Sequence, residues 1–151
     1  MDTNNHSPDS CIFCAIVAGR APAEVVYEDE HTLAFLDINP ATRGHVLVVS
    51  KTHARDIFDI TEEAAQHVMR AVLRVARAVD EALHPDGVNL IQANRRAAFQ
   101  SVFHVHVHVI PRWWDDGIAA PWKHEQGDPH MLRETAETIR ATMVHPEGGG
   151  M

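Results

Sequence analysis

The stretch FHVHVHVIPR, residues 103–112, alternates three histidines with valines and closes with a proline and an arginine. Side chains of a β-strand point to opposite faces in turn, so His104, His106 and His108 share one face and the valines share the other. A face made only of valine is most simply buried. An exposed face usually mixes several polar residue types, so three histidines in register favour a functional site.

Histidine binds zinc, and it also acts as a nucleophile or as an acid and base near neutral pH. Same-face positions lie about 6.5–7 Å apart along a strand, whereas zinc needs each ligand nitrogen within about 2.1 Å. Three histidines of one strand therefore fit a single metal ion poorly, although two of them can join one. The spacing favours one central reactive imidazole with helpers on either side.

The rest of the chain predicts strands in runs and few helices. Thr61 can cap a long helix with Glu62 and Glu63 in its first turn, and valines recur at steps of three and four between Ala65 and Leu83. Short helices are expected near residues 11–19 and 131–143. Strands that follow one another, instead of alternating with helices, favour an α+β fold with a mainly antiparallel sheet. The predicted strands cover residues 24–28, 32–37, 45–50, 88–92 and 102–110.

The composition limits the classes of protein that the chain can belong to. Its 151 residues, 45% hydrophobic and 23% charged, suit one soluble globular domain. No apolar stretch reaches the ~18 residues of a membrane span, and the polar N-terminus does not resemble a signal peptide, so we expect a cytoplasmic protein. A net charge of −8 argues against nucleic-acid and membrane-surface partners.

Both cysteines of the chain lie in one motif, Cys11-Ile-Phe-Cys14. Two cysteines without a secretory signal do not make a disulfide framework. The motif alone leaves a redox pair, half of a zinc site, or two small buried side chains. A redox pair usually follows a strand in a βαβ unit, which is missing here, and a structural zinc site needs two further ligands.

The histidine stretch, with Gln100-Ser-Val before it, resembles the His-x-His-x-His signature of the histidine triad (HIT) family. Residues 28–53, EDEHTLAFLDINPATRGHVLVVSKTH, resemble the family's strand, Asp-Ile turn, Gly-His and Lys-x-His in the same order. The resemblance implies the HIT fold as a single domain over residues 1–151, with a core at about 11–112 and an irregular tail with a C-terminal helix at 113–144. It also implies a homodimer formed through the long helix and a sheet edge.

The resemblance further implies an enzyme, a nucleotide hydrolase or transferase that acts at the α-phosphate. Its substrates would be nucleoside phosphoramidates or dinucleoside polyphosphates of adenosine or another purine. His106 would attack phosphorus to form a nucleotidyl-histidine intermediate, while its other ring nitrogen donates to a backbone carbonyl. His108 would donate to a phosphate oxygen, with His45 and Ser101 completing the catalytic set.

Further residues are implied for binding the nucleotide. Asp37 matches the acid that binds the ribose hydroxyls, since two carboxylate oxygens suit a vicinal diol; local sequence would equally have it cap the turn at Asn39-Pro40. Ile38 would line the base pocket with Phe13 and Phe35, for which core packing is an equal interpretation. The implied nucleotide-binding residues are Asp37, Ile38, Asn94, Gln100, Ser101, His106 and His108.

Some bacterial HIT proteins bind a structural zinc through a similar Cys-x-x-Cys, the histidine of Lys-x-His and the first histidine of the triad. The matching residues here are Cys11, Cys14, His53 and His104. Two cysteines and two histidines are an ordinary set of zinc ligands. The resemblance therefore implies one structural zinc ion, and it assigns the first histidine of the opening stretch to the metal.

One loop departs from the family pattern. The family usually has Asn-Gly-x-x-Ala-Gly before the glutamine, whereas Arg95 and Phe99 occupy the two glycine positions here. The arginines either lie in solvent or supply charge for a longer polyphosphate. The altered loop leaves open a nucleotide-binding regulatory protein with little turnover, and a zinc-binding module without catalysis is the third interpretation.

Overall fold

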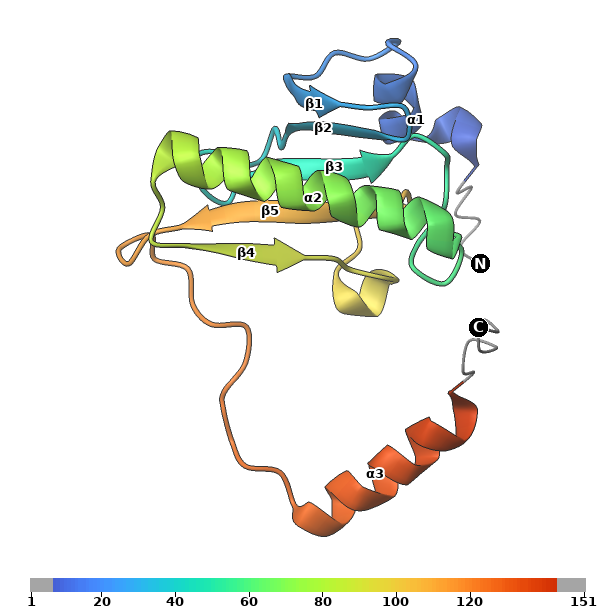
Figure 1. The fold of residues 1–151 in the computed structure, drawn as a ribbon, viewed down its shortest axis with the longest axis vertical. Coiled ribbons are helices and arrows are strands. Elements are labelled where there is room, and N and C mark those ends of the chain that lie inside the picture. The colour runs from blue at the N-terminus through green and yellow to red at the C-terminus, as the bar shows by residue number, and fades with distance from the viewer. Residues whose placement is uncertain (1–6, 144–151) are drawn as a thin grey trace, which may run out of the picture. The chain divides into compact units, whose positions relative to one another are not determined.

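The computed structural model describes residues 7–143, and its central element is one five-stranded antiparallel sheet with the strand order β1-β2-β3-β5-β4 (Figure 1). One long helix lies across the sheet and the described chain also has shorter helices, so the predicted α+β fold class is confirmed. The strands are β1 (Val25–Glu28), β2 (Thr32–Leu36), β3 (Val46–Ser50), β4 (Gly87–Ile91) and β5 (His106–Arg112). The helices are η1 (Pro8–Ser10), α1 (Ile12–Val17), α2 (Glu62–Leu83), η2 (Arg96–Ala98) and α3 (Pro129–Thr142).

The chain divides into two compact units between Gly117 and Ile118. The first unit holds the sheet with α1 and α2, and the second holds α3. The single-domain prediction over 1–151 stays a prediction, and residues 1–6 and 144–151 lie outside the described residues. Within residues 7–143, the helices are all too short or too polar to cross a membrane.

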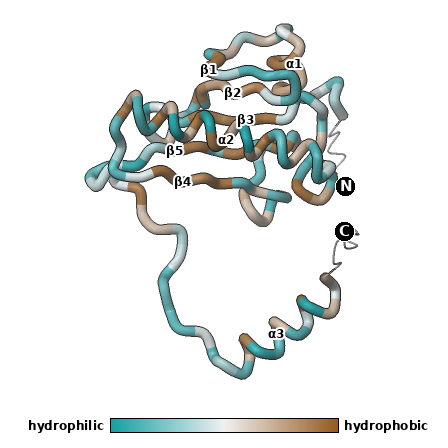
Figure 2. The backbone as a smooth tube through the Cα atoms, viewed as in Figure 1, coloured by the Kyte–Doolittle hydropathy of each residue, from teal (hydrophilic) through white to brown (hydrophobic). Residues whose placement is uncertain are grey.

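Helix α2 covers the valine face of the sheet. Thr61 caps the helix, since its hydroxyl accepts a hydrogen bond from the Ala64 N–H at 3.1 Å, as predicted. Val109 of β5 is fully buried in one core cluster with Val72 and other α2 valines. The central strands are coloured mostly hydrophobic, whereas α2 alternates between hydrophobic and hydrophilic segments (Figure 2). Burial of this apolar stripe holds α2 on the sheet.

The histidine face of the sheet carries a second core cluster, which packs against α1. In the β3–β5 ladder His108 lies opposite Leu47, and His106 lies opposite Val49. His106 and His108 therefore extend onto β5 the rows of apolar side chains that β3 presents on this face. The buried members of the cluster are Phe13, Leu33, Phe35, Leu47 and Val49.

Strand β5 begins at His106, so the prediction of a strand from Val102 is wrong. The reason is the loss of a partner: β3 ends at Ser50, and the Val105 N–H donates instead to the carbonyl of Ala54 at 2.7 Å. His104 consequently lies just before the strand. Its side chain is set by the loop and not by the pleat of the sheet.

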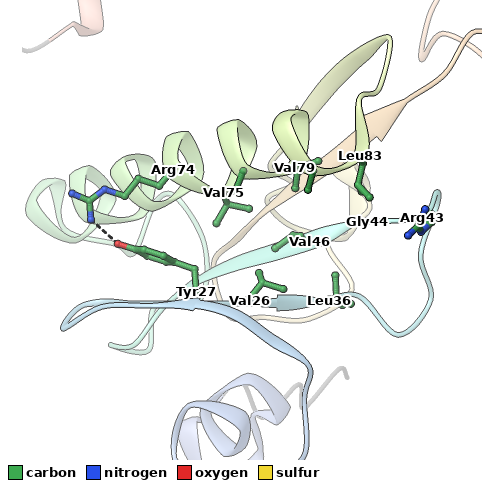
Figure 3. Close-up of a pocket in the computed structure, with 12 residues that line it drawn as sticks. Val26, Tyr27, Leu36, Arg43, Gly44, Val46, Arg74, Val75, Val79 and Leu83 are labelled. Atoms are coloured by element: carbon green, nitrogen blue, oxygen red, sulfur yellow. Dashed lines mark hydrogen bonds between the residues drawn. The ribbon is translucent and has the colours of Figure 1, made fainter.

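A groove of about 400 Å³ runs between α2 and strands β1 to β3 (Figure 3). At one end the Arg74 guanidinium donates to the Tyr27 hydroxyl at 2.7 Å, and that hydroxyl donates to Asp29 at 2.8 Å. Burial raises the pKa of Asp29, but hydrogen bonds from Tyr27 and from the His31 and Thr32 N–H groups outweigh it and lower the pKa to about 2. The hydrogen bonds from Arg74 to Tyr27 and from Tyr27 to Asp29 hold the β1–β2 hairpin against α2.

Gly44 closes the other end of the groove and directs the chain into β3. Its φ is +90°, and an added Cβ would collide with the Leu83 side chain and lie 3.3 Å from Pro111. A side chain at this position is therefore disfavoured by backbone strain, and it also requires the Leu83 side chain to shift. The next residue is His45, so the same turn sets where that imidazole emerges.

Replacing Gly44 with alanine is expected to destabilise the fold by about 2–4 kcal/mol, because strain at positive φ adds to overpacking. Gly19→Ala is the matched control, since Gly19 also has a positive φ of +75° but no heavy atom lies within 4 Å of its added Cβ. Its cost should be about 1–2 kcal/mol. Urea unfolding of both variants measures the difference, and equal costs would contradict the packing argument.

Candidate functional site

A pocket of about 520 Å³ opens on the histidine face of the sheet. It is lined by apolar side chains of α1 and the sheet and by two of the three histidines, His106 and His108. Its size is that of a small-molecule site. The residues singled out from the sequence that line it are Phe13, Phe35, Asp37, Ile38, Ser101, His106 and His108.

The central histidine is buried and its tautomer is determined by one contact. His106 Nδ1 lies 2.7 Å from the carbonyl oxygen of His104. A carbonyl only accepts, so Nδ1 carries the proton and Nε2 keeps its lone pair. The ring packs edge-on against Phe13, with 5.1 Å between the ring centroids. The arrangement leaves a nucleophilic nitrogen in a fixed orientation.

A chain of hydrogen bonds sets the tautomers of His45 and His108 as well. The Ala41 N–H donates to His45 Nδ1 at 2.9 Å, so the proton of His45 is on Nε2. That Nε2 lies 2.8 Å from Nδ1 of His108, which must accept. His108 is then protonated on Nε2. The last ring of the triad therefore offers a donor, as a phosphate-binding role requires.

Burial keeps all three imidazoles neutral. It lowers the pKa of His106, an effect that the hydrogen bond to the His104 carbonyl partly opposes. It also lowers the pKa of His108 and of His45, where the Asp37 carboxylate opposes it. Since a free histidine titrates at about 6.5, these rings are uncharged at neutral pH. A neutral His106 is the form that can attack an electrophile.

Asp37 caps the turn at Asn39-Pro40, and its contact with ribose hydroxyls stays a prediction. One carboxylate oxygen accepts from the Asn39 N–H at 2.8 Å and so caps the turn, while the other lies 3.5 Å from His45 Nε2. The carboxylate also lines the pocket, beside Ile38, whose side chain is 89% exposed. Asp37 is thereby held at the pocket with an oxygen available to a ligand.

Asn94 and Gln100 are used to hold the loop between β4 and β5. The Gln100 amide donates to the Arg55 carbonyl at 2.7 Å and accepts from the Arg95 N–H at 2.7 Å. The Asn94 oxygen accepts from the Ile57 N–H at 2.8 Å. The bonds to Arg55 and Ile57 join the loop to the segment 54–59. Direct contact of either amide with a phosphate stays a prediction.

Arg95 and Phe99 keep backbone conformations that favour glycine. Arg95 has φ 69° and ψ 161°, a region essentially restricted to glycine, and Phe99 is left-handed with φ 70°. The Arg95 guanidinium lies 4.3 Å from the ring centroid of Phe58, a cation–π contact. The loop therefore retains the backbone path of a glycine loop while carrying two large side chains.

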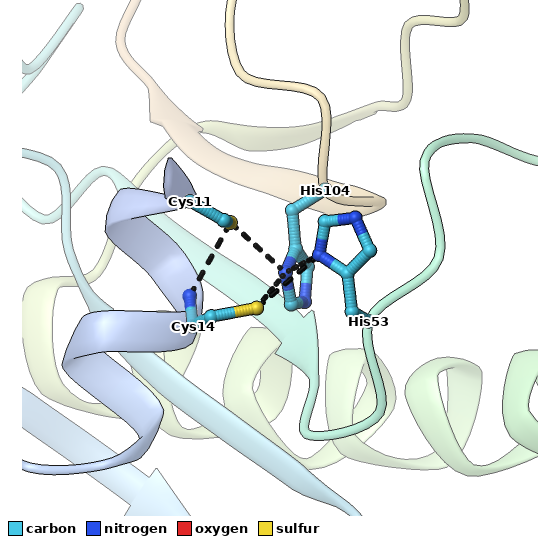
Figure 4. A group of neighbouring side chains, drawn as sticks. All are labelled: Cys11, Cys14, His53 and His104. Carbon is cyan, nitrogen blue, oxygen red and sulfur yellow. Dashed lines mark hydrogen bonds between the residues drawn. The ribbon is translucent and has the colours of Figure 1, made fainter. Parts of the chain in front are cut away.

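The four residues predicted to bind zinc come together beside α1 (Figure 4). The Cys11 sulfur lies 3.4 Å from His104 Nδ1, and the Cys14 sulfur lies 3.2 Å from His53 Nδ1. The two histidine nitrogens are 3.3 Å apart. All four candidate ligand atoms lie within 4.8 Å of one another.

These distances fit a tetrahedral zinc ion. Zn–S bonds of about 2.3 Å and Zn–N bonds of about 2.0–2.1 Å place two nitrogens about 3.3 Å apart and a sulfur and a nitrogen about 3.6 Å apart. The His104 Nε2 N–H donates to the Ser50 carbonyl at 2.7 Å, which leaves Nδ1 for the metal. Burial and the nearby Cys11 sulfur raise the pKa of Cys14 to about 11, so a thiolate there requires a cation.

Several partners in this site are backbone groups that carry no sequence signal. The carbonyls of Ser50 and His104 and the N–H of Ala41 determine the tautomers of the three histidines that they contact. Any residue type other than proline supplies the same N–H, and every residue supplies a carbonyl. Only the position of the chain in space reveals their part in the site.

Comparison with known proteins agrees with this architecture. Residues 18–113 match the HIT domain. The chain is 44% identical to Protein hit of Bacillus subtilis over 137 residues, which is 89% of this chain and 94% of that one. It is 36% identical to adenosine 5′-monophosphoramidase hnt1 of Schizosaccharomyces pombe over 131 residues, 86% of this chain and 96% of the other.

Solved structures give the same result. A HIT family protein from Bacillus anthracis superposes with a TM-score of 0.85 at 42% identity, over 91% of this chain and 100% of that one. A zinc-bound histidine triad family protein from Mycobacterium smegmatis has a TM-score of 0.71 at 41% identity, again over 91% and 100%. The fold and the site define a histidine triad protein. The chain belongs to the HIT family.

The purified protein is expected to contain one zinc ion per chain, because the four ligand atoms have tetrahedral spacing. Elemental analysis measures the metal. In the Cys11→Ser/Cys14→Ser variant the zinc should be lost and the melting temperature should fall, and a chelator should lower the melting temperature of the wild type. Full zinc content in the double variant, or a metal-free wild type, would contradict this assignment.

Proposed function

We propose that this protein transfers or hydrolyses nucleotidyl groups at the α-phosphate of nucleoside phosphoramidates or dinucleoside polyphosphates. The observation that carries the proposal is the 2.7 Å contact between His106 Nδ1 and the His104 carbonyl at a pocket that also holds Asp37. It leaves His106 with an unprotonated nitrogen at the wall of a nucleotide-sized pocket. The adenosine 5′-monophosphoramidase among its relatives supports the reaction class.

In the first step the His106 Nε2 lone pair attacks the α-phosphorus. A phosphorus–nitrogen bond forms, the bond to the leaving group breaks, and the electron pair departs with that group. The Nε2–H of His108 donates to a phosphoryl oxygen and stabilises the charge that develops there. An amine leaving group takes up one proton from solvent as it departs. Water then attacks phosphorus, the bond from phosphorus to His106 Nε2 breaks, its electron pair returns to the imidazole, and one proton of the water passes to solvent.

The nucleoside part is assigned to the apolar side of the pocket. The Asp37 carboxylate accepts from the ribose hydroxyls, and Ile38 lies against the base with Phe13 and Phe35 deeper in the pocket. Among the described residues that line the pocket, the charged side chain is Asp37, which is assigned to the ribose and not to the base. Adenosine is therefore proposed from the named relative and not from a contact.

The zinc ion is proposed to hold protein groups in place and to take no part in the reaction itself. His104 would bind zinc with its side chain, while its carbonyl accepts the proton of His106. The metal thereby fixes the peptide group that orients the nucleophile. Its ligands are all protein side chains, which is the composition of a structural site.

The expected homodimer also stays a proposal. Strand β4 is at the edge of the sheet, and its Leu90 and Ile91 are 46% and 48% exposed. On α2, Met69 and Leu73 are 56% and 47% exposed. Exposed apolar side chains on a free strand edge and an adjacent helix are features of an association surface.

Replacing His106 with alanine should lower kcat/KM for adenosine 5′-phosphoramidate at least about 1000-fold, since the variant has no nucleophile. His130→Ala, an exposed histidine of α3, is the control and should retain full activity. Release of AMP measures both. Turnover that survives in His106→Ala would exclude this nucleophile, and wild-type nucleotide binding without turnover would favour a regulatory protein.

The pH dependence of kcat/KM follows from the lowered pKa values of the three histidines. Protonation removes the lone pair of His106, and this occurs only below the ordinary value of about 6.5. The rate should be level between about pH 7 and 8 and fall at more acidic pH. A pH series with a substrate that does not itself titrate in this range measures it. A decline that begins above pH 7 would contradict the buried, neutral triad.

A further inference from the structure

The groove between α2 and strands β1 to β3, called the α2 groove below, lies on the face of the sheet opposite the triad (Figure 3). Its volume of about 400 Å³ is that of a small-molecule site. Leu36, at the end of β2, lines both this groove and the nucleotide pocket. The proposed dimer surface at β4 is at the opposite edge of the sheet from β1, so the proposed dimer leaves the groove accessible.

The walls of the α2 groove are aliphatic over most of their length, with side chains that include Val26, Leu36, Val46, Val75, Val79 and Leu83. The aromatic residue among the described lining residues is Tyr27, whose hydroxyl is already bonded to Arg74 and Asp29. No carboxylate or side-chain amide is found among the described residues that line the groove. A nucleoside or a sugar requires such polar partners. The walls therefore suit a hydrocarbon chain.

Arg43 supplies a cation at the end of the groove that Gly44 closes. Figure 3 shows Arg43 and Arg74 at opposite ends. The turn that carries Arg43 is held in place, because the hydroxyl of Thr42 donates to the carbonyl of Pro111 at 2.6 Å. Among the residues that the structure describes, Arg43 has no ion pair or side-chain hydrogen bond, whereas Arg74 donates to a tyrosine hydroxyl. The Arg43 guanidinium is therefore available to an anion.

We propose that the α2 groove binds a free medium-chain fatty acid, with the carboxylate on Arg43 and the hydrocarbon chain along α2 toward Arg74. A guanidinium matches a carboxylate through two parallel hydrogen bonds. From Leu83 back to Arg74 the helix advances about 14 Å, at 1.5 Å per residue, which leaves room for an extended chain. The chain would cover Val26 and Leu36, which are 51% and 37% exposed. This site does not depend on the proposed nucleotidyl transfer.

The first test measures the binding of decanoate to the full chain as purified, by isothermal titration calorimetry below the concentration at which decanoate forms micelles. Saturable binding at one site per chain is expected. Decanol has the same hydrocarbon chain without the charge, and it should bind about tenfold more weakly because the charge-assisted contact is lost. Octanoate should also bind about tenfold more weakly, because two fewer methylene groups are buried.

Two variants test whether the ligand lies in the groove. Arg43→Gln should weaken decanoate binding about tenfold and leave decanol binding unchanged. Its matched control is Arg77→Gln, at an exposed position of α2 outside the groove lining, which should change neither. Ala78→Phe fills the groove from an exposed position of α2 and should abolish binding of both ligands, whereas Gln66→Phe, exposed outside the lining, should not. Thermal melting checks that each variant is folded.

Equal affinities for decanoate and decanol, or full binding in Ala78→Phe, would overturn the fatty-acid site. Displacement of decanoate by AMP would do the same, because it would assign the chain to the apolar side of the nucleotide pocket. Absence of saturable binding would also overturn it, and a smaller oligomer of Ala78→Phe on size-exclusion chromatography would then assign the groove to a second copy of the chain. The calorimetry does not depend on turnover, so a failure of the proposed nucleotidyl transfer would leave this test intact.

Discussion

The hydrogen bond from His106 to the carbonyl of His104 is the contact on which the candidate site depends. It determines which ring nitrogen of His106 is free, and it joins the proposed nucleophile to a residue of the candidate metal site. The same residue is tied to the sheet, because its Nε2–H donates to the last carbonyl of β3. One residue, His104, therefore connects the candidate metal site and the sheet through its side chain and the His106 imidazole through its carbonyl.

Burial makes this arrangement chemically useful. The apolar cluster of α1, β2 and β3 surrounds the histidine face and excludes water, so the pKa values of His106 and His108 are lowered. In water an imidazole would be partly protonated near neutral pH. The cost of burying polar rings is limited because each ring nitrogen that faces the protein has a hydrogen-bond partner. Packing and reactivity thus have the same origin.

The loop between β4 and β5 shows where sequence patterns are least informative. The replacement of two glycines by Arg95 and Phe99 suggests an altered backbone, yet both residues adopt positive φ. The network of Gln100 and Asn94 with residues 54–59 holds the loop in that conformation. Tertiary contacts outweigh the local preference of the side chains, at a cost of about 1–3 kcal/mol per strained residue. The predicted start of β5 was wrong for a related reason, because the start of the strand depends on where its partner strand β3 ends.

The sequence by itself determined the fold class, through valine alternation and the period of α2, and it identified the triad and the cysteine motif. These are local patterns, and the spacing of residues along the chain is enough to reveal them. The tertiary structure confirmed the meeting of residues 11, 14, 53 and 104 that the family resemblance predicted, and it alone decided that His104 precedes the strand. It also identified the groups that assign the protons of the triad, which are the carbonyls of Ser50 and His104 and the His45 ring whose tautomer the Ala41 N–H sets, because folding brings these groups together from distant parts of the chain.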